Sequence, residues 1–371
     1  MRTTIMWIEF VPQSIAAIRI YLIRKGLPAS YRVLIIRTAT DGAAHPPPHP
    51  SMTVSTSRDR LWRKRLHELS SVWPDFVAGQ TAGLHKTRVA SRRIREALPV
   101  VAASAPSAKV KKLDRKMRDL TRFLGPIREL DVELGILDDE TKPEGVPDRA
   151  IEMVRREVAT RREELRHGLE KNAPVGDMKK LIRKLERIAE RGDEERADAG
   201  GKAEAQWRGI LATRLLRRAK SLRAALDNAG PLYAPERIHD VRISTKKLRY
   251  ALEIAHDSGV PGAAPLVKTL KRQQERLGRL HDLQSLLGHV REAEASTGVG
   301  SRVNALAAYA DALERNCRRL HAGFVEHRHE LAHCVTAVRQ QLVPALTMPR
   351  RRQARVSGPA HPASRPRSRA R

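Results

Sequence analysis

Two stretches of the sequence carry a histidine among basic residues in the same order. Residues 84–95 read LHKTRVASRRIR, and residues 238–249 read IHDVRISTKKLR, 154 positions later. In a helix, where each residue adds about 100°, one face about 80° wide would carry the histidine and three of the bases. These faces consist of His85, Arg88, Arg92 and Arg95 in the first stretch, and of His239, Arg242, Lys246 and Arg249 in the second.

Rows of like charge at this spacing are destabilising, by roughly a few tenths of a kcal/mol for each pair. The sequence therefore favours a multivalent anion as the partner of these faces, and the alternative is pairing with acids of neighbouring helices, including Glu129 and Asp282. The histidines allow two interpretations. An imidazole among cations has a lowered pKa, and it could donate a hydrogen bond to a phosphate oxygen and gain a proton there. It could equally be a packing residue that a carbonyl or a nearby acid satisfies.

A second motif follows each stretch at nearly the same offset. Residues 124–131 read LGPIRELD and residues 277–284 read LGRLHDLQ, so the glycines of the two motifs are 153 positions apart. A matched order of motifs at one offset indicates an internal duplication. Four further bases occupy matching positions between the motifs: Arg115 and Arg118 in the first copy, and Lys268 and Lys271 in the second.

Residues 58–346 have apolar side chains at helical spacing throughout, without the alternation of a strand. We therefore predict an all-α protein of long helices, arranged as two four-helix bundles related by internal duplication and a pseudo-two-fold axis. The first repeat would span about residues 58–195 and the second about 202–346. The acidic segment 192–198 falls at a glycine-flanked break between them, and we expect a solvated loop there.

The chain is strongly basic, with 71 Lys and Arg against 42 Asp and Glu in 371 residues. The ends hold part of the net charge of +29, but residues 52–348 alone keep +17. Such an excess indicates a polyanionic partner: nucleic acid, anionic lipid or a phosphate polymer. Aromatic residues make up only 4%, which disfavours base stacking on single-stranded nucleic acid. Trp62 and Trp73 fall among apolar residues at helical spacing and are expected in the core.

The two ends differ in composition from the body. Residues 1–51 are expected to be a disordered or mis-assigned extension, with Met52 as the biological start. Charged residues and a proline interrupt their apolar run, so no membrane span is predicted there. Residues 349–371 contain eight arginines and no acid, and we expect a disordered tail. The predicted folded domain is therefore 52–348.

The cysteines and the clustered histidines give little sign of a metal or a disulfide. Cys317 and Cys334 would lie about 25 Å apart on one helix, too far for a disulfide, so we expect a reducing, cytoplasmic setting. A histidine-rich segment precedes Cys334, but it lacks a second cysteine pair, and we expect no metal or other cofactor. Its histidines are His327, His329 and His333.

The two histidine stretches, each followed by its Leu-Gly motif, resemble the two halves of a CHAD domain, the conserved histidine α-helical domain. The resemblance covers about residues 58–346 and implies two four-helix bundles around a basic central cavity that binds inorganic polyphosphate. Members of the family can localise to polyphosphate granules. The contacts implied by motif position are His85, Arg88, Arg92, Arg93 and Arg95, then His239, Arg242, Lys246, Lys247 and Arg249. Arg115, Arg118, Lys268 and Lys271 are implied by repeat register and charge alone.

This chain departs from the family's pattern at one position and lacks one associated motif. Arg128 stands where the second Leu-Gly motif has His281, which argues against a symmetric pair of metal sites. The domain is often fused to a triphosphate-tunnel domain with an ExExK motif, and this sequence contains neither that motif nor a GxxxxGK[ST] loop. We therefore expect no enzyme activity. The alternative partner is nucleic acid, which a basic cleft binds non-specifically at low salt.

Overall fold

The computed structural model divides the chain into two compact units, Met1–Val54 and Ser55–Arg371. The first unit contains two short antiparallel strands, β1 (Met6–Ile8) and β2 (Ile20–Leu22). The remainder of residues 1–51 and the predicted tail lie outside the described residues. The structure describes residues 6–8, 20–22, 57–102, 107–138, 143–172, 178–199, 201–298 and 300–348.

The described part of the second unit is helical throughout, which confirms the all-α fold class. The helices of its first half are α1 (Ser57–Val77), α2 (Thr81–Val101), α3 (Ser107–Phe123), α4 (Gly125–Leu137), α5 (Asp148–Asn172) and α6 (Met178–Ala199). Those of its second half are α7 (Gly201–Ala229), α8 (Pro235–Asp257), α9 (Ala263–Ser296) and α10 (Ser301–Ala337), followed by a π-helical turn η1 (Val338–Leu342) and α11 (Val343–Thr347).

The helices of the two halves begin at offsets close to those of the repeated motifs. The first residues of α2 and α8 are 154 positions apart, and those of α5 and α10 are 153 positions apart. The halves differ at the Leu-Gly motif, which α9 crosses as a single helix while α3 ends and α4 begins there. Pro126 explains the division, because proline has no N–H to donate within a helix but fits the first turn of a new one.

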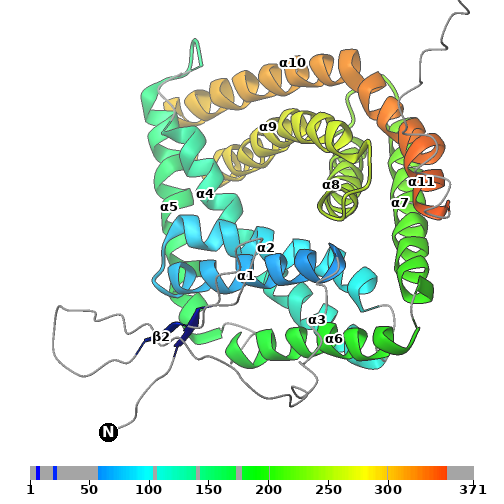
Figure 1. Ribbon diagram of the computed structural model, residues 1–371. Coiled ribbons are helices and arrows are strands. Elements are labelled where there is room, and N and C mark those ends of the chain that lie inside the picture. The colour runs from blue at the N-terminus through cyan, green and yellow to red at the C-terminus, as the bar shows by residue number, and fades with distance from the viewer. Residues whose placement is uncertain are drawn as a thin grey trace, which may run out of the picture. The chain divides into compact units, whose positions relative to one another are not determined.

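The second half closes as a four-helix bundle, since α7, α8, α9 and α10 pack in chain order and α10 returns against α7 (Figure 1). In the first half, α2 packs between α1 and α3, and α6 covers α1 and α2. The part equivalent to α10 is divided here into α5 and α6, and α5 packs with α4 against α9 and α10. The two halves also meet where α2 lies against α8.

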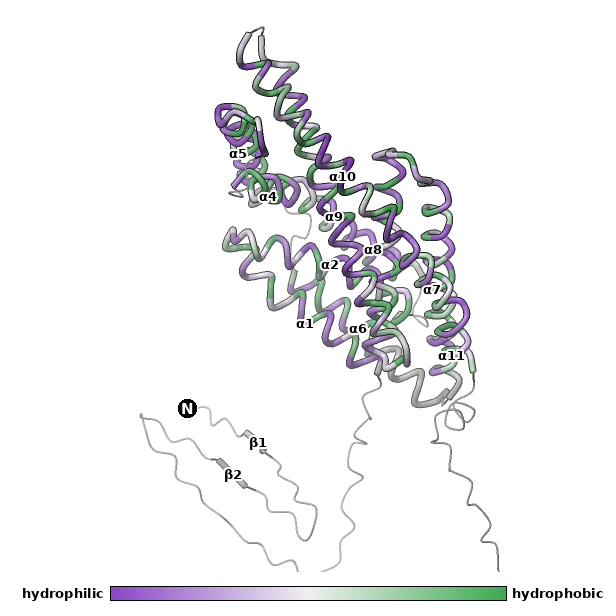
Figure 2. Tube along the Cα trace, turned by 90° about the horizontal axis from the view of Figure 1, so that it is seen from above, coloured by the Kyte–Doolittle hydropathy of each residue, from purple (hydrophilic) through white to green (hydrophobic). Residues whose placement is uncertain are grey.

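Buried apolar side chains of these helices form the core. Hydrophobic and hydrophilic residues alternate along the helices (Figure 2). Trp62 of α1 is fully buried, and its Nε1 donates a hydrogen bond of 3.0 Å to the Leu185 carbonyl of α6. Trp73 packs partly buried against the same core. None of the described helices is long and apolar enough to cross a bilayer. The predicted inner stripe of α2 is buried at every position: Ala90, Ile94, Ala97, Leu98 and Val101.

The prediction of a loop at residues 192–198 is wrong, because helix α6 continues through this segment to Ala199. A glycine inside a helix costs only about 1 kcal/mol relative to alanine. The glutamate, arginine and alanine residues that surround Gly192 are good helix formers, so this 22-residue helix tolerates it.

One polar contact between the halves joins α4 to α9. Glu133 of α4 is 1% exposed and accepts a hydrogen bond of 2.7 Å from the Ser285 hydroxyl. Its other carboxylate oxygen lies 2.6 Å from His289 Nδ1, and this hydrogen bond raises the pKa of His289. The carboxylate therefore fixes the contact between the two Leu-Gly helices.

Candidate polyanion-binding site

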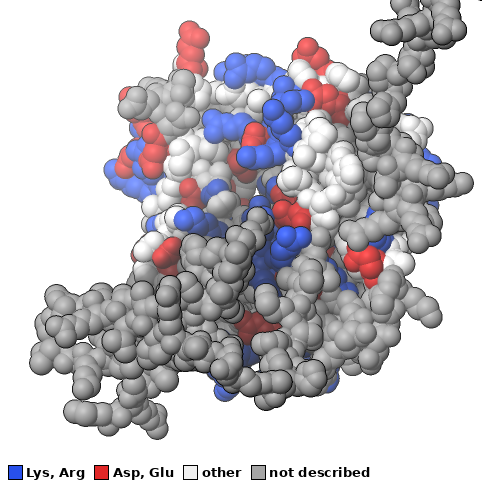
Figure 3. Space-filling view, viewed as in Figure 1, with Lys and Arg blue, Asp and Glu red and all other residues white. Residues whose placement is uncertain are grey.

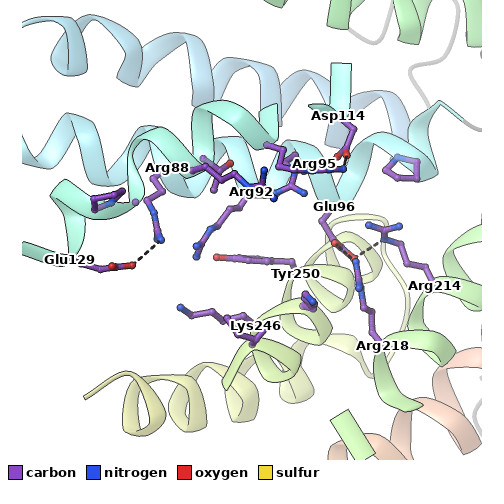
Figure 4. A pocket seen from close by; sticks show the side chains of 18 residues that line it. Arg88, Arg92, Arg95, Glu96, Asp114, Glu129, Arg214, Arg218, Lys246 and Tyr250 are labelled. Carbon is purple, nitrogen blue, oxygen red and sulfur yellow. Dashed lines mark hydrogen bonds and ion pairs between the residues drawn. The ribbon is translucent and has the colours of Figure 1, made fainter. Parts of the chain in front are cut away.

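A pocket of about 900 Å³ lies between α2 and α8, the two helices that carry the histidine stretches. In Figure 4, Arg88, Arg92 and Arg95 project from one wall, and Lys246 and Tyr250 project from the other. Nine basic and three acidic side chains line it, a formal excess of six positive charges. Lysine and arginine side chains also gather across the middle of the face in Figure 3, with acids among them. The bases are Arg88, Arg92, Arg95, Arg118, Arg122, Arg214, Arg218, Lys246 and Lys247.

Six of the residues that the sequence singled out lie together in this lining. The helices α2 and α8 supply five of the six, although Lys246 is the only member of the predicted basic face of α8 among them. The sixth comes from α3, the helix that follows α2. The six residues are Arg88, Arg92, Arg95, Arg118, Lys246 and Lys247.

Two other predicted contacts are engaged in ion pairs outside the pocket lining. The guanidinium of Arg93 lies 3.3 Å from Glu68 of α1 and 3.3 Å from Glu253 of α8. Arg249 donates to Gln274 at 2.6 Å, and it also pairs with Glu253 one turn later on its own helix. Both side chains therefore tie helices together. The pairing with acids that was the alternative interpretation of the basic faces is thus present for Arg249, and within the pocket lining also for Arg88 and Arg95.

Three more predicted bases are exposed and lie outside the lining: Arg115, Lys268 and Lys271. Arg242 also lies outside it, although it is close enough to Arg92 and Lys246 to interact with their charges. Burial lowers the pKa of Arg242, and the nearby Asp282 opposes this shift. Arg242 therefore adds positive potential near two bases of the pocket without belonging to its lining.

The two histidines of the repeated stretches lie beside the pocket, and each has a different partner. Arg128 Nε donates a hydrogen bond of 2.8 Å to His85 Nδ1, so the proton of a neutral His85 is on Nε2. The ring of His239 instead lies 5.1 Å from that of His281, centroid to centroid. Partial burial and nearby arginines lower the pKa of His85 and His239, and they lower the pKa of His281 to about 3. Arg128 stands where the second half has His281. The partner of His85 is therefore a guanidinium group, whereas the partner of His239 is a second imidazole ring.

Four bases of the pocket lining have no acidic partner among the described residues. Among the described residues, no carboxylate forms an ion pair with Arg92, Arg122, Lys246 or Lys247. Burial, followed by the charges of Arg242 and Arg92, lowers the pKa of Lys246 to about 6. Its amine is therefore mostly neutral at pH 7 while the pocket is empty. A bound anion would favour the charged form.

The three acids of the lining each pair with arginines. Glu129 lies 3.9 Å from Arg88, and its side chain is 54% exposed. Asp114 lies 3.3 Å from Arg95 and 2.8 Å from Arg118. Glu96 is the most enclosed of the three. Its partners, described below, come from α7.

Four polar residues of the pocket lining were not singled out from the sequence: Arg122, Arg214, Arg218 and Tyr250. Arg214 and Arg218 are one helical turn apart on α7, so the sequence predicts that they share a face of that helix. It does not predict that this face contacts α2. Tyr250 follows the second histidine stretch directly, and the residue 154 positions before it, Glu96, also lines the pocket. The Tyr250 hydroxyl has no hydrogen-bond partner among the described residues.

The histidine-rich segment of α10 contains a motif that was also missed. Residues 329–333 read HELAH, which matches the HExxH pattern of zinc metalloproteases. The carboxylate of Glu330 lies 2.6 Å from Arg272 and accepts a hydrogen bond of 2.7 Å from Gln273, both on α9. His329 and His333 are exposed, and the described residues contain no group of three metal-binding side chains. Glu330, the glutamate of the motif, thus joins α10 to α9 through these two contacts.

The chain matches the family model of the CHAD domain over residues 60–291. This match covers more than half of the 371 residues, and the protein belongs to the CHAD domain family.

A similar solved structure is the crystal structure of the CHAD domain from the plant Ricinus communis. The two chains are 20% identical, with a TM-score of 0.47, and the similarity covers 76% of this chain and 91% of that one. No curated protein matches the sequence.

Proposed function

We propose that this protein binds inorganic polyphosphate, without hydrolysing it, in the pocket between α2 and α8. The observation that supports this most directly is the convergence of Arg92, Lys246 and Lys247 from two helices into one pocket without acidic partners among the described residues. Membership of a family known for polyphosphate binding supports it independently.

Polyphosphate suits the chemistry of this pocket. It carries about one negative charge for each phosphate, and guanidinium groups donate paired hydrogen bonds to phosphate oxygens. A narrow chain without bases needs no aromatic platform, and Tyr250 is the one aromatic residue of the lining. Its ring is only 8% exposed, and the Arg249 guanidinium lies 4.5 Å from its centroid, so little of the ring is left for stacking.

The absence of catalysis is part of the proposal. Phosphoryl transfer requires a group that positions the attacking nucleophile, and it commonly uses a metal that carboxylates hold. Each carboxylate in the lining is already paired with an arginine, and two of them with two arginines. In a cell, such a protein would store, sense or accompany its ligand, and it would lie in the cytoplasm or on polyphosphate granules.

A binding titration against polyphosphates of several lengths, at physiological salt, tests the proposal. Long-chain polyphosphate should displace labelled duplex DNA at a far lower phosphate concentration than DNA displaces polyphosphate. The reverse order would identify the site as a nucleic-acid interface. Incubation with polyphosphate and Mg²⁺, followed by a phosphate assay, should release no orthophosphate, and steady release would show that the protein is an enzyme.

A further inference from the structure

The acid at one end of the pocket is held differently from the other two. Glu96 of α2 lies 2.7 Å from Arg214 Nε through one carboxylate oxygen and 3.0 Å from Arg218 Nη2 through the other. The Glu96 side chain is 9% exposed, and those of Arg214 and Arg218 are 11% and 18% exposed. Figure 4 shows both arginines directed at this carboxylate, at the end of the pocket opposite Glu129.

A carboxylate held by two guanidinium groups occupies the position that a phosphate would take. Both are anions with oxygens that accept hydrogen bonds from the arginine fork. Arg214 and Arg218 line the same pocket as the unpaired bases Arg92 and Lys246, so they would otherwise continue the row of cations along it. Glu96 therefore acts as an internal anion that already fills the next phosphate position.

The repeated sequence supports this interpretation. Glu96 follows Arg95 at the end of the first histidine stretch, and Tyr250 follows Arg249 at the end of the second. Both residues line the pocket. The first half thus contributes to the pocket a carboxylate that pairs with two arginines, and the second contributes a hydroxyl group without a hydrogen-bond partner among the described residues.

We propose that Glu96 limits the length of polyphosphate that the pocket binds, by withholding Arg214 and Arg218 from the ligand. This inference rests on the proposed function and defines one end of that binding site. In the wild type, affinity should rise with chain length and then level off once the chain covers the unpaired bases. Further phosphates would meet two guanidinium groups whose hydrogen-bond donors Glu96 already engages and whose positive charge it half offsets.

The substitution Glu96→Gln tests this, because the amide keeps the shape and one acceptor but removes the charge. We expect affinity for long-chain polyphosphate to rise about tenfold, the value of one good ionic contact. The chain length at which affinity levels off should also increase. Glu129→Gln is the matched control, because it also removes one negative charge, at the opposite end of the pocket. It should raise the affinity for chains of all lengths by a similar factor of about two.

A second pair of variants keeps the test independent of how well Glu96→Gln folds. Arg218→Gln removes a cation that is already occupied while Arg214 remains paired, so affinity should change less than twofold. Arg122→Gln removes an unpaired cation of the same lining and should weaken binding about fivefold or more.

If Arg218→Gln weakens binding as much as Arg122→Gln, Arg218 already contacts the ligand and the inference is overturned. Equal length profiles for Glu96→Gln and Glu129→Gln would overturn it too, whereas a wild type that binds no polyphosphate would refute the proposed function itself.

Discussion

Arg93 of α2 and Glu253 of α8 form an ion pair of 3.3 Å across the contact between the two halves. Glu253 also pairs with Arg249, and Arg93 also pairs with Glu68 of α1. The network therefore joins the helices that form the two walls of the pocket. It sets their relative position without using any base of the pocket lining.

Removal of Glu253 should lower the free energy of unfolding. The carboxylate is 11% exposed, and Glu253→Ala would leave Arg93 and Arg249 facing each other without an acid between them. Removing one partner of a buried pair costs about 3–5 kcal/mol, and we expect about 2 kcal/mol here because Arg93 is partly exposed. Urea denaturation followed by circular dichroism measures this loss.

Glu314→Ala is the control for that experiment. Glu314 also pairs with two arginines, Arg291 and Arg318, but their side chains are 58% and 67% exposed. Exposed pairs contribute little, so the loss should stay below about 0.5 kcal/mol. Equal losses in the two variants would show that the contact between α2 and α8 has no special role in stability.

Charge reversal at two matched positions should abolish polyphosphate binding. Arg88 of α2 lines the pocket, and Arg242 of α8 is close enough to interact with Arg92 of its lining, so Arg88→Glu with Arg242→Glu replaces attraction with repulsion on both helices. We expect affinity to fall at least about 100-fold, equivalent to two ionic contacts, with the helical circular dichroism unchanged.

The matched control reverses two predicted bases that lie outside the lining. Lys268→Glu with Lys271→Glu changes the net charge by the same amount, but both side chains are exposed and away from the pocket lining. Affinity should then fall less than about threefold. A comparable loss in both double variants would mean that the whole basic surface binds the ligand. Unfolding of the Arg88 and Arg242 variant would instead assign these arginines to the stability of the helix contact.

Binding should take up a proton at Lys246. The pKa of its amine is about 6 in the empty pocket, so the neutral form dominates at pH 7 to 8. A bound polyanion raises this pKa, and linkage then makes affinity fall as pH rises from about 6 toward the pKa of the complex. Below about pH 6 both states are charged, and the dependence on Lys246 should disappear. Binding titrations at several pH values measure the slope of affinity against pH. Long polyphosphate chains are used because they have few terminal phosphates, so proton uptake by the ligand itself contributes little.

Lys246→Met should reduce that slope, because it removes the titrating group while keeping a side chain of similar length. Lys247→Met is the control from the next position, which is exposed and also lines the pocket. It should weaken binding and leave the pH dependence in place. An unchanged slope in Lys246→Met would refute the proton uptake at this residue.

The Tyr250 hydroxyl should donate a hydrogen bond to the ligand. It has no partner among the described residues, and it belongs to the pocket lining. Tyr250→Phe should therefore weaken polyphosphate binding about tenfold or more, as expected for one hydrogen bond to a charged acceptor. Tyr233→Phe removes a hydroxyl that accepts a hydrogen bond from Gln284 at 3.0 Å, outside the lining, and should leave affinity unchanged. Equal affinities of Tyr250→Phe and the wild type would contradict this role.

Periodicity and repetition predicted much of this architecture. The helical class and the inner stripe of α2 followed from the spacing of apolar residues, because that spacing is a local property of each helix. Arg92 and Lys246 hold matching positions in the two histidine stretches, and the repeated motif order was the reason to expect their faces at equivalent positions. These arguments needed no knowledge of which distant helices touch.

The remaining features depend on contacts between segments far apart in the chain. Arg249 shares the predicted basic face, but Glu253 lies one turn further along the helix and pairs with it. The position equivalent to Glu253 in the first half is Pro99, so the matching Arg95 has no such acid and lines the pocket. Likewise, Arg214 is 118 residues from the Glu96 that it contacts, a pairing that no local pattern encodes.

The two arginines that hold Glu96 have a consequence for stoichiometry. A binding site that ends at a paired carboxylate favours the terminus of a linear polymer, because a chain bound by its middle would have to continue past Glu96. A linear polyphosphate has two termini whatever its length. Saturated complexes would then contain about two protein molecules for each polymer, where a groove open at both ends would load more copies onto longer chains.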